Sequence, residues 1–235
     1  MSNKPFRFKQ FSINQDKTAM KVGTDGVLLG AWSDVENTKN ILDVGTGTGL
    51  ISLMFAQRNF DAKIDAIEID ENAYLQAQEN FEKSNFSHQI TVHHQDFKTY
   101  YSSKKYDLIV SNPPYFVENK RLEESSRKQA RQQYNLSFDD LIFKMSELLT
   151  KEGNISLILP YNSLEEIISI AKKNQLFLTK LTYIKGNLTS DYIRVLLNFS
   201  FVEKKLEQNE LIIENVRHQY TEDYINLTKD FYLKM

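Results

Sequence analysis

The residues Asn112-Pro113-Pro114-Tyr115 combine groups that can recognise a planar amine. Two consecutive prolines remove two backbone N–H donors and restrict both φ angles, so this turn offers mainly carbonyl acceptors in a stiff arrangement. The side-chain carbonyl of Asn112 adds an acceptor, and the ring of Tyr115 can stack on the ring that carries the amine. The combination suits an unpaired nucleobase. The alternative is an ordinary proline-rich turn in which Asn112 caps the end of a strand.

The segment before this turn, residues 107–111, is a short apolar run that predicts a buried parallel strand. An earlier strand, residues 41–44, leads directly into Gly45-Thr46-Gly47-Thr48-Gly49 and a helix over residues 50–58. Strand, glycine loop and helix in this order begin a nucleotide-binding α/β sheet.

The spacing of the glycine loop is Gly-x-Gly-x-Gly, which differs from the Gly-x-Gly-x-x-Gly that accommodates a pyrophosphate. This difference argues against NAD and favours a cofactor without phosphates, and S-adenosylmethionine fits. We expect Gly45, Gly47 and Gly49 to let the backbone approach this cofactor. Asp43, at the end of the strand, is expected near the ammonium group of the cofactor or its water shell.

Acidic residues follow the next two predicted strands. Glu68 comes after the strand over residues 63–67, where a carboxylate commonly holds the hydroxyls of a ribose. Asp70 is expected to cap the helix that follows. After a strand over residues 89–93, Asp96 is placed to accept the adenine amino group of the cofactor, with Phe97 against its ring.

The N-terminal part predicts a short strand or arm over residues 6–13 and then a helix over residues 26–32, capped by Thr24 or Asp25. We assign Lys21 and Thr24 to the cofactor site and expect this helix to cover it. Simple packing of the helix on the core is the alternative.

After the proline turn, residues 116–135 form a long polar connection of the kind that acts as a lid, a binding segment or a disordered loop. A helix is expected to begin with Ser137 as its cap and to close at residues 151–153. The remaining elements are predicted strands over residues 154–159, 176–185 and 192–202, helices over 163–174 and 222–233, and a possible short strand over 211–214.

Together these elements predict a Rossmann-like α/β fold with a seven-stranded, mostly parallel sheet and an antiparallel last strand. The strands over 176–185 and 192–202 are joined by a turn too short for a helix, so we expect an antiparallel hairpin. We expect one domain over residues 1–235, with an arm over 1–33, a catalytic core over 40–202 and an extension over 203–235.

Composition excludes several other classes. The chain contains no cysteine, which rules out disulfides, thiolate nucleophiles and cysteine-bound zinc. The neighbouring residues His93 and His94 would point to opposite faces of a strand, so we predict no metal site. No apolar run of membrane-spanning length and no signal-peptide core is present, so we expect a cytoplasmic protein, and we expect a monomer.

The formal net charge is −2, but basic residues gather in the N-terminal arm and after the proline turn, on both sides of the candidate site. Such runs are usually solvated faces, and acidic residues dilute the second group. We nevertheless take the two groups as candidate RNA contacts: Lys4, Arg7, Lys9, Lys120, Arg121, Arg127, Lys128 and Arg131.

The glycine loop, the acids after the second and third strands and the Asn112 turn resemble class I S-adenosylmethionine methyltransferases that methylate amines. Within that class the chain resembles the bacterial tRNA1(Val) adenine-N6-methyltransferase family. The residues that carry this resemblance are Phe8-Lys9-Gln10-Phe11, Gln15-Asp16, the run from Met20 to Trp32, Asn112 to Phe116, and Asp230-Phe231-Tyr232-Leu233.

This resemblance implies methylation of the adenine directly 3′ of the anticodon of a valine tRNA, with Asn112, Pro113, Pro114 and Tyr115 as catalytic residues. Asn14 and Gln132 stand where the family commonly has histidine, which leaves substrate choice more open than the chemistry.

Other functions remain compatible with the residues. The Asn-Pro-Pro-Tyr turn also occurs in enzymes that methylate a protein glutamine, a DNA adenine or a guanine of ribosomal RNA. A non-catalytic S-adenosylmethionine-binding protein that interacts with RNA is a further alternative. Retention of Asn112, Pro113 and Tyr115 argues against that alternative.

Overall fold

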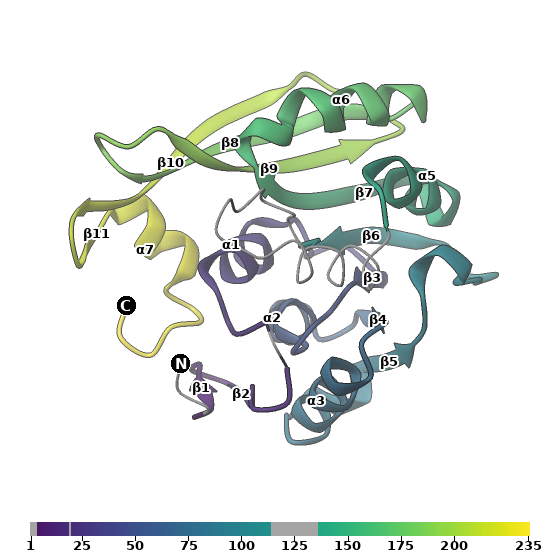
Figure 1. The fold of residues 1–235 in the computed structure, drawn as a ribbon, viewed down its shortest axis with the longest axis horizontal. Coiled ribbons are helices and arrows are strands. Elements are labelled where there is room, and N and C mark those ends of the chain that lie inside the picture. Colours follow the sequence, from purple (N-terminus) through teal and green to yellow (C-terminus); the bar gives the residue numbers. More distant parts are fainter. Residues whose placement is uncertain (1–3, 19, 114–135) are drawn as a thin grey trace, which may run out of the picture.

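The computed structural model describes residues 4–18, 20–113 and 136–235. In this part of the chain a nine-stranded sheet has the order β11-β10-β8-β9-β7-β6-β3-β4-β5 (Figure 1). Its strands are β3 (Asn40–Val44), β4 (Lys63–Glu68), β5 (Ile90–His94), β6 (Tyr106–Ser111), β7 (Leu149–Pro160), β8 (Phe177–Asn187), β9 (Tyr192–Ser200), β10 (Glu207–Val216) and β11 (Gln219–Tyr220).

The centre of the sheet confirms the predicted α/β architecture. Strands β5, β4, β3, β6 and β7 pair in parallel, and β9 lies antiparallel between β7 and β8. The predicted hairpin is therefore present as β8 and β9. Because the parallel strands share a direction, the loops after β3, β4 and β6 meet at one edge of the sheet.

The predicted number of strands was too low. The possible strand over residues 211–214 is the longer β10, which pairs in parallel with β8, and β11 extends the sheet further. Within β10 only Leu211 is buried, so its sequence lacks the apolar alternation that identifies a strand. β10 forms because β8 offers it an edge for strand pairing, and the sequence of residues 207–216 does not reveal this pairing by itself.

Helices cover both faces of the sheet and bury two apolar clusters. The first cluster lies under α1 (Thr24–Trp32), α2 (Leu50–Arg58), α3 (Glu71–Glu82) and α7 (Glu222–Thr228), and the second under α5 (Phe138–Leu148) and α6 (Leu164–Lys173). Successive strand residues point to opposite faces, so Ile41 belongs to the first cluster and Leu42 to the second. Short 3-10 turns are η1 (Ser87–Gln89), η2 (Phe97–Thr99) and η3 (Tyr161–Ser163).

Two of the predicted helix caps are confirmed, but the cap predicted for α1 was wrong, because α1 begins at Thr24 with Gly23 as its N-cap and no side-chain cap. Asp70 Oδ1 accepts a hydrogen bond from the backbone N–H of Ala73 at 2.8 Å, and Ser137 Oγ accepts one from the N–H of Asp140 at 3.1 Å. In contrast, α5 ends at Leu148 and the expected stop at residues 151–153 lies inside β7. The last helix ends at Thr228 and not near residue 233.

The N-terminal arm is a hairpin of β1 (Phe6–Arg7) and β2 (Ser12–Ile13) that packs on the C-terminal segment. The backbone N–H of Lys9 donates to the carbonyl of Phe231 at 2.8 Å, and Phe8 forms a β-bridge with Tyr232. Figure 1 shows β1 beside the C-terminal segment after α7. Among the described helices, none combines the length and apolar character that crossing a bilayer requires.

Candidate active site

The glycine loop after β3 has one open side and one packed side. Gly45, Gly47 and Gly49 have φ angles of +72°, +59° and +83°. A Cβ atom built on Gly45 or Gly47 meets no atom within 4 Å, whereas one built on Gly49 overlaps the ring of Phe81. The first two glycines therefore border open space, and the third allows α2 and α3 to pack closely.

Asp43 lies fully buried at the end of β3, beneath this loop. Its Oδ2 accepts hydrogen bonds from Thr46 Oγ1 at 2.6 Å and Ser52 Oγ at 2.7 Å. Its Oδ1 is buried and has no hydrogen-bond partner among the described residues. Burial raises the pKa of Asp43 to about 6, although the two hydroxyl donors oppose this rise. The site thus contains a buried acceptor that a donor or cation would satisfy.

Glu68 connects the end of β4 to the glycine loop. Its Oε2 accepts a hydrogen bond from the N–H of Gly47 at 2.9 Å, and its Oε1 accepts from the N–H groups of Ile69 and Asp70, both at 2.9 Å. Burial raises the pKa of this carboxyl, while the backbone donors favour its charged form. Glu68 therefore helps to hold the glycine loop in the conformation that leaves space free beside Gly45 and Gly47.

A cavity of about 460 Å³ joins several of the predicted residues from separate parts of the chain. Lys21 lines it from the segment before α1, Thr24 from the first residue of α1, Gly45 and Gly47 from the glycine loop, and Asn112 from the position after β6. This convergence places the candidate amine-binding residue beside the candidate cofactor loop.

The cavity wall also contains residues that sequence reasoning missed. Asp25 and Arg194 line it, and Ile184, Ile193 and Ile213 form an apolar side. These isoleucines come from β8, β9 and β10, whose positions depend on long-range strand pairing. No local pattern in the sequence indicates that these strands reach the glycine loop.

Five predicted cofactor residues do not line this cavity. Asp43, Gly49 and Glu68 lie in or next to its glycine loop, and Asp96 and Phe97 lie after β5. Asp96 Oδ1 caps the turn η2 by accepting a hydrogen bond from the N–H of Lys98 at 2.9 Å. The side chain of Phe97 is buried in the second apolar cluster. Neither residue lines the 460 Å³ cavity.

Part of the predicted site falls outside the described residues. Pro114, Tyr115 and the basic residues Lys120, Arg121, Arg127, Lys128 and Arg131 belong to this part. Within the described arm, Lys4, Arg7 and Lys9 are exposed, and the ammonium group of Lys9 donates to the carbonyl of Lys229 at 2.6 Å.

Two amide side chains hold the segment before α1 against the glycine loop. Gln15 Oε1 accepts a hydrogen bond from the N–H of Val22 at 3.0 Å. The Nδ2 group of Asn80 donates to the carbonyl of Asn14 at 3.0 Å and to the carbonyl of Thr48 at 2.8 Å. Because Asn80 contacts both segments, α3 sets the position of the N-terminal segment relative to the loop.

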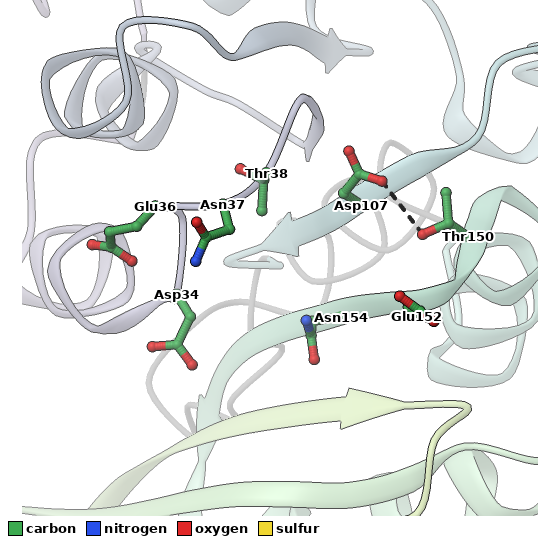
Figure 2. Close-up of a pocket in the computed structure, with 8 residues that line it drawn as sticks. All are labelled: Asp34, Glu36, Asn37, Thr38, Asp107, Thr150, Glu152 and Asn154. Carbon is green, nitrogen blue, oxygen red and sulfur yellow. Dashed lines mark hydrogen bonds between the residues drawn. The ribbon is translucent and has the colours of Figure 1, made fainter.

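A second hollow, of about 310 Å³, lies at the opposite edge of the sheet, near the starts of β3 and β6. Figure 2 shows the side chains that line it, among them the carboxylates of Asp34, Glu36, Asp107 and Glu152. None of the predicted site residues lines this hollow. The negative charges of these carboxylates would repel a polyanion such as RNA.

The sheet, the glycine loop and the cavity define the class to which this protein belongs. The family model for the methyltransferase small domain matches residues 22–162. A predicted O-methyltransferase from Agrobacterium tumefaciens has the same fold, with a TM-score of 0.69, 21% identity, and coverage of 88% of this chain and 96% of that chain. A ribosomal protein L11 methylase from Lactobacillus delbrueckii subsp. bulgaricus gives a TM-score of 0.53 at 18% identity over 74% of this chain and 76% of that chain. The protein is a methyltransferase.

Curated relatives narrow this class to one family. A protein of Christiangramia forsetii is 46% identical over 100% of both chains, and one of Flavobacterium psychrophilum is 48% identical over 98% of this chain and 100% of its own. Both are named tRNA1(Val) (adenine(37)-N6)-methyltransferase. This chain belongs to the tRNA1(Val) (adenine(37)-N6)-methyltransferase family.

Proposed function

We propose that this protein transfers a methyl group from S-adenosylmethionine to the exocyclic N6 atom of the adenine 3′ of the anticodon in tRNA1(Val). The names of the full-length relatives support this substrate. The main structural support for the proposal is that the glycine loop and Asn112 line the same cavity. A cytoplasmic location and a single domain over residues 1–235 are part of the proposal.

The residues around the loop fit S-adenosylmethionine. Open space above Gly45 and Gly47 can accept a ligand against the backbone, and the unpartnered Oδ1 of Asp43 suits a nearby positive charge. We assign the carboxylate of the cofactor to Lys21 and the start of α1, where the N-cap Gly23 has no side-chain cap. Glu68 is assigned to the ribose hydroxyls and Asp96 to the adenine amino group, whereas the ring of Phe97 is buried in the second apolar cluster and is no longer assigned to the adenine.

Asn112 and Pro113 are assigned to the target amine. The nitrogen is a weak nucleophile because its lone pair is delocalised into the adenine ring. Acceptance of its two hydrogens by the Asn112 side-chain oxygen and the Pro113 carbonyl would draw the nitrogen toward tetrahedral geometry and release the lone pair for attack. S-adenosylmethionine held at the glycine loop would supply an electrophilic methyl group for this nitrogen, and its sulfur would leave as a neutral thioether. The proton released from nitrogen passes to water after transfer.

The remaining assignments concern the RNA. Stacking of Tyr115 on the flipped base would contribute about 1–3 kcal/mol, as in comparable single-strand sites. An anticodon-loop adenine is already partly unpaired, which lowers the cost of flipping it. Lys4, Arg7 and Lys9 and the basic residues after the site are assigned to phosphates.

Replacement of Asn112 by Ala tests the catalytic part of this proposal. We expect Asn112→Ala to lower kcat for unmodified tRNA1(Val) by about 10²–10³, the usual loss when one preorganised polar group is removed from a reacting centre. The measurement is transfer of labelled methyl from S-adenosylmethionine, with nucleoside analysis of the product and calorimetric titration of the cofactor.

The exposed Asn162 of η3 provides a matched control, and Asn162→Ala should keep the full rate. Full activity of Asn112→Ala would remove Asn112 from the mechanism. Label that entered protein or DNA in place of tRNA would keep the methyl donor and overturn the substrate.

A further inference from the structure

An ion pair forms part of the cavity wall and takes no part in the steps above. Arg194 Nε donates to Asp25 Oδ2 at 2.8 Å, and both side chains are a little over one quarter exposed, at 28% and 27%. Arg194 Nη1 also donates to the carbonyl of Ile193 at 2.9 Å. Among the described residues that line the cavity, the charged ones are Lys21, Asp25 and Arg194. Since Asp25 is neutralised by Arg194, the lining has a net positive charge.

Strand register places Arg194 beyond the end of β6, and both Arg194 and Asn112 line the cavity. Ser111 pairs with Leu157 of β7, and Arg194 pairs with Pro160, three residues further along β7. At about 3.3 Å per residue, Arg194 lies about 10 Å beyond the end of β6 along the strand direction. Because β7 lies between β6 and β9, Arg194 is also displaced sideways by two strand spacings, about 10 Å. The resulting Cα separation from the end of β6, about 14 Å, can be spanned by one nucleotide together with an extended arginine side chain. With its base at Asn112, a flipped nucleotide can thus bring its phosphate within reach of Arg194.

We infer that Arg194, oriented by Asp25, binds the phosphodiester group next to the target adenosine. This inference rests on the proposed function and adds a specific phosphate subsite to it. A guanidinium has five N–H donors in a planar fork that matches phosphate geometry, and an ion pair with a fixed carboxylate limits its rotation. The arrangement favours a nucleic acid over a protein glutamine as substrate, because a peptide carries no phosphate at this position.

A second ion pair provides a matched control. Lys180 Nζ lies 3.1 Å from Asp34 Oδ1 and joins β8 to the segment after α1, much as Arg194 joins β9 to the start of α1. Lys180 also lies over the ring of Trp32, at 4.7 Å from its centroid. Neither Lys180 nor Asp34 lines the 460 Å³ cavity. Loss of this pair removes one positive charge and one link between α1 and the sheet, but no phosphate contact.

The test measures the affinity of the protein for unmodified tRNA1(Val) at several KCl concentrations. Each phosphate contact in a single strand contributes about 0.7 to the slope of log K against log salt. We expect Arg194→Gln to reduce the magnitude of this slope by about that amount and to raise KM for tRNA about tenfold or more. Arg194→Lys and Asp25→Asn should keep the slope, since both retain the positive charge, and Lys180→Gln should match the unaltered protein.

A chemical change in the RNA tests whether Arg194 and the phosphate form one interaction. We expect a neutral methylphosphonate beside the target adenosine of an anticodon stem-loop to weaken binding to the unaltered protein. The same change should have little further effect on Arg194→Gln, because the two changes remove one interaction. Equal sensitivity of both proteins to the methylphosphonate, or an unchanged salt slope in a folded Arg194→Gln, would overturn this subsite. If the unaltered protein transferred no methyl group to tRNA, the proposed function and this inference would both fail.

Discussion

At the scale of single residues, Asp43 shows how burial prepares a carboxyl group for a charged ligand. Burial raises its pKa from the ordinary value of 3.8 to about 6, and the nearby Glu68 charge acts in the same direction. In the folded protein without ligand, Asp43 therefore keeps a proton at pH values where the unfolded chain has lost it. As pH rises from about 4 to 6 the free energy of unfolding falls, because the folded state binds the extra proton.

This raised pKa predicts a pH-dependent affinity for S-adenosylmethionine. The cofactor carries a net positive charge, so its binding should favour the ionised form of Asp43 and lower the pKa of this group. The dissociation constant should therefore fall as pH rises from about 5 to 7, by up to about tenfold for each pKa unit recovered. Calorimetric titration across this range provides the measurement. Asp43→Asn should remove this pH dependence, and a variant with the same pH profile as the unaltered protein would exclude Asp43 as its source.

At the scale of elements, the unit formed by β3, the glycine loop and α2 separates a binding role from a packing role. Gly45 and Gly49 both have positive φ angles, but only at Gly49 would an added Cβ meet a side chain, the ring of Phe81. The same substitution at the two positions therefore has different physical consequences.

Substitution of each glycine by Ala should separate these roles. Gly45→Ala places a methyl group in the open cavity and should cost about 1–2 kcal/mol through its left-handed conformation, while it strongly weakens cofactor binding. Gly49→Ala should destabilise the protein by about 1–3 kcal/mol more, because its Cβ overlaps the Phe81 ring. Urea unfolding of both variants gives the comparison. Equal unfolding free energies would contradict the distinction.

At the scale of the whole molecule, the two ends of the described chain stabilise each other. Phe8, Phe11 and Phe231 are buried in the first apolar cluster, and Lys9 is joined to the C-terminal segment by hydrogen bonds from both its backbone and its side chain. The N-terminal hairpin continues into the segment that Gln15 and Asn80 hold over the glycine loop. The C-terminal segment thus acts indirectly on the position of Lys21 and Thr24.

Truncation of a buried C-terminal side chain should expose this dependence. We expect Phe231→Ala to lower the free energy of unfolding by about 3–5 kcal/mol and to increase hydrogen exchange of the amides in β1 and β2. Leu233, which is 56% exposed in the same segment, serves as the control, and Leu233→Ala should change stability by no more than about 0.5 kcal/mol. Unchanged exchange in the N-terminal hairpin of Phe231→Ala would show that the two ends are independent.

The sequence by itself determined the order of the central strands and helices along the chain, the glycine loop and the place of Asn112 directly after β6, because each depends on a local pattern. Apolar runs, helix caps such as Asp70 and Ser137, and glycines before a helix act over a few residues. Only the tertiary structure decided which side chains meet around the cavity. Arg194 reaches Asp25 because β9 inserts antiparallel between β7 and β8, and the polar β10 joins the sheet because β8 offers it an edge. These contacts depend on pairing between distant segments, whose free energy no short stretch of sequence contains.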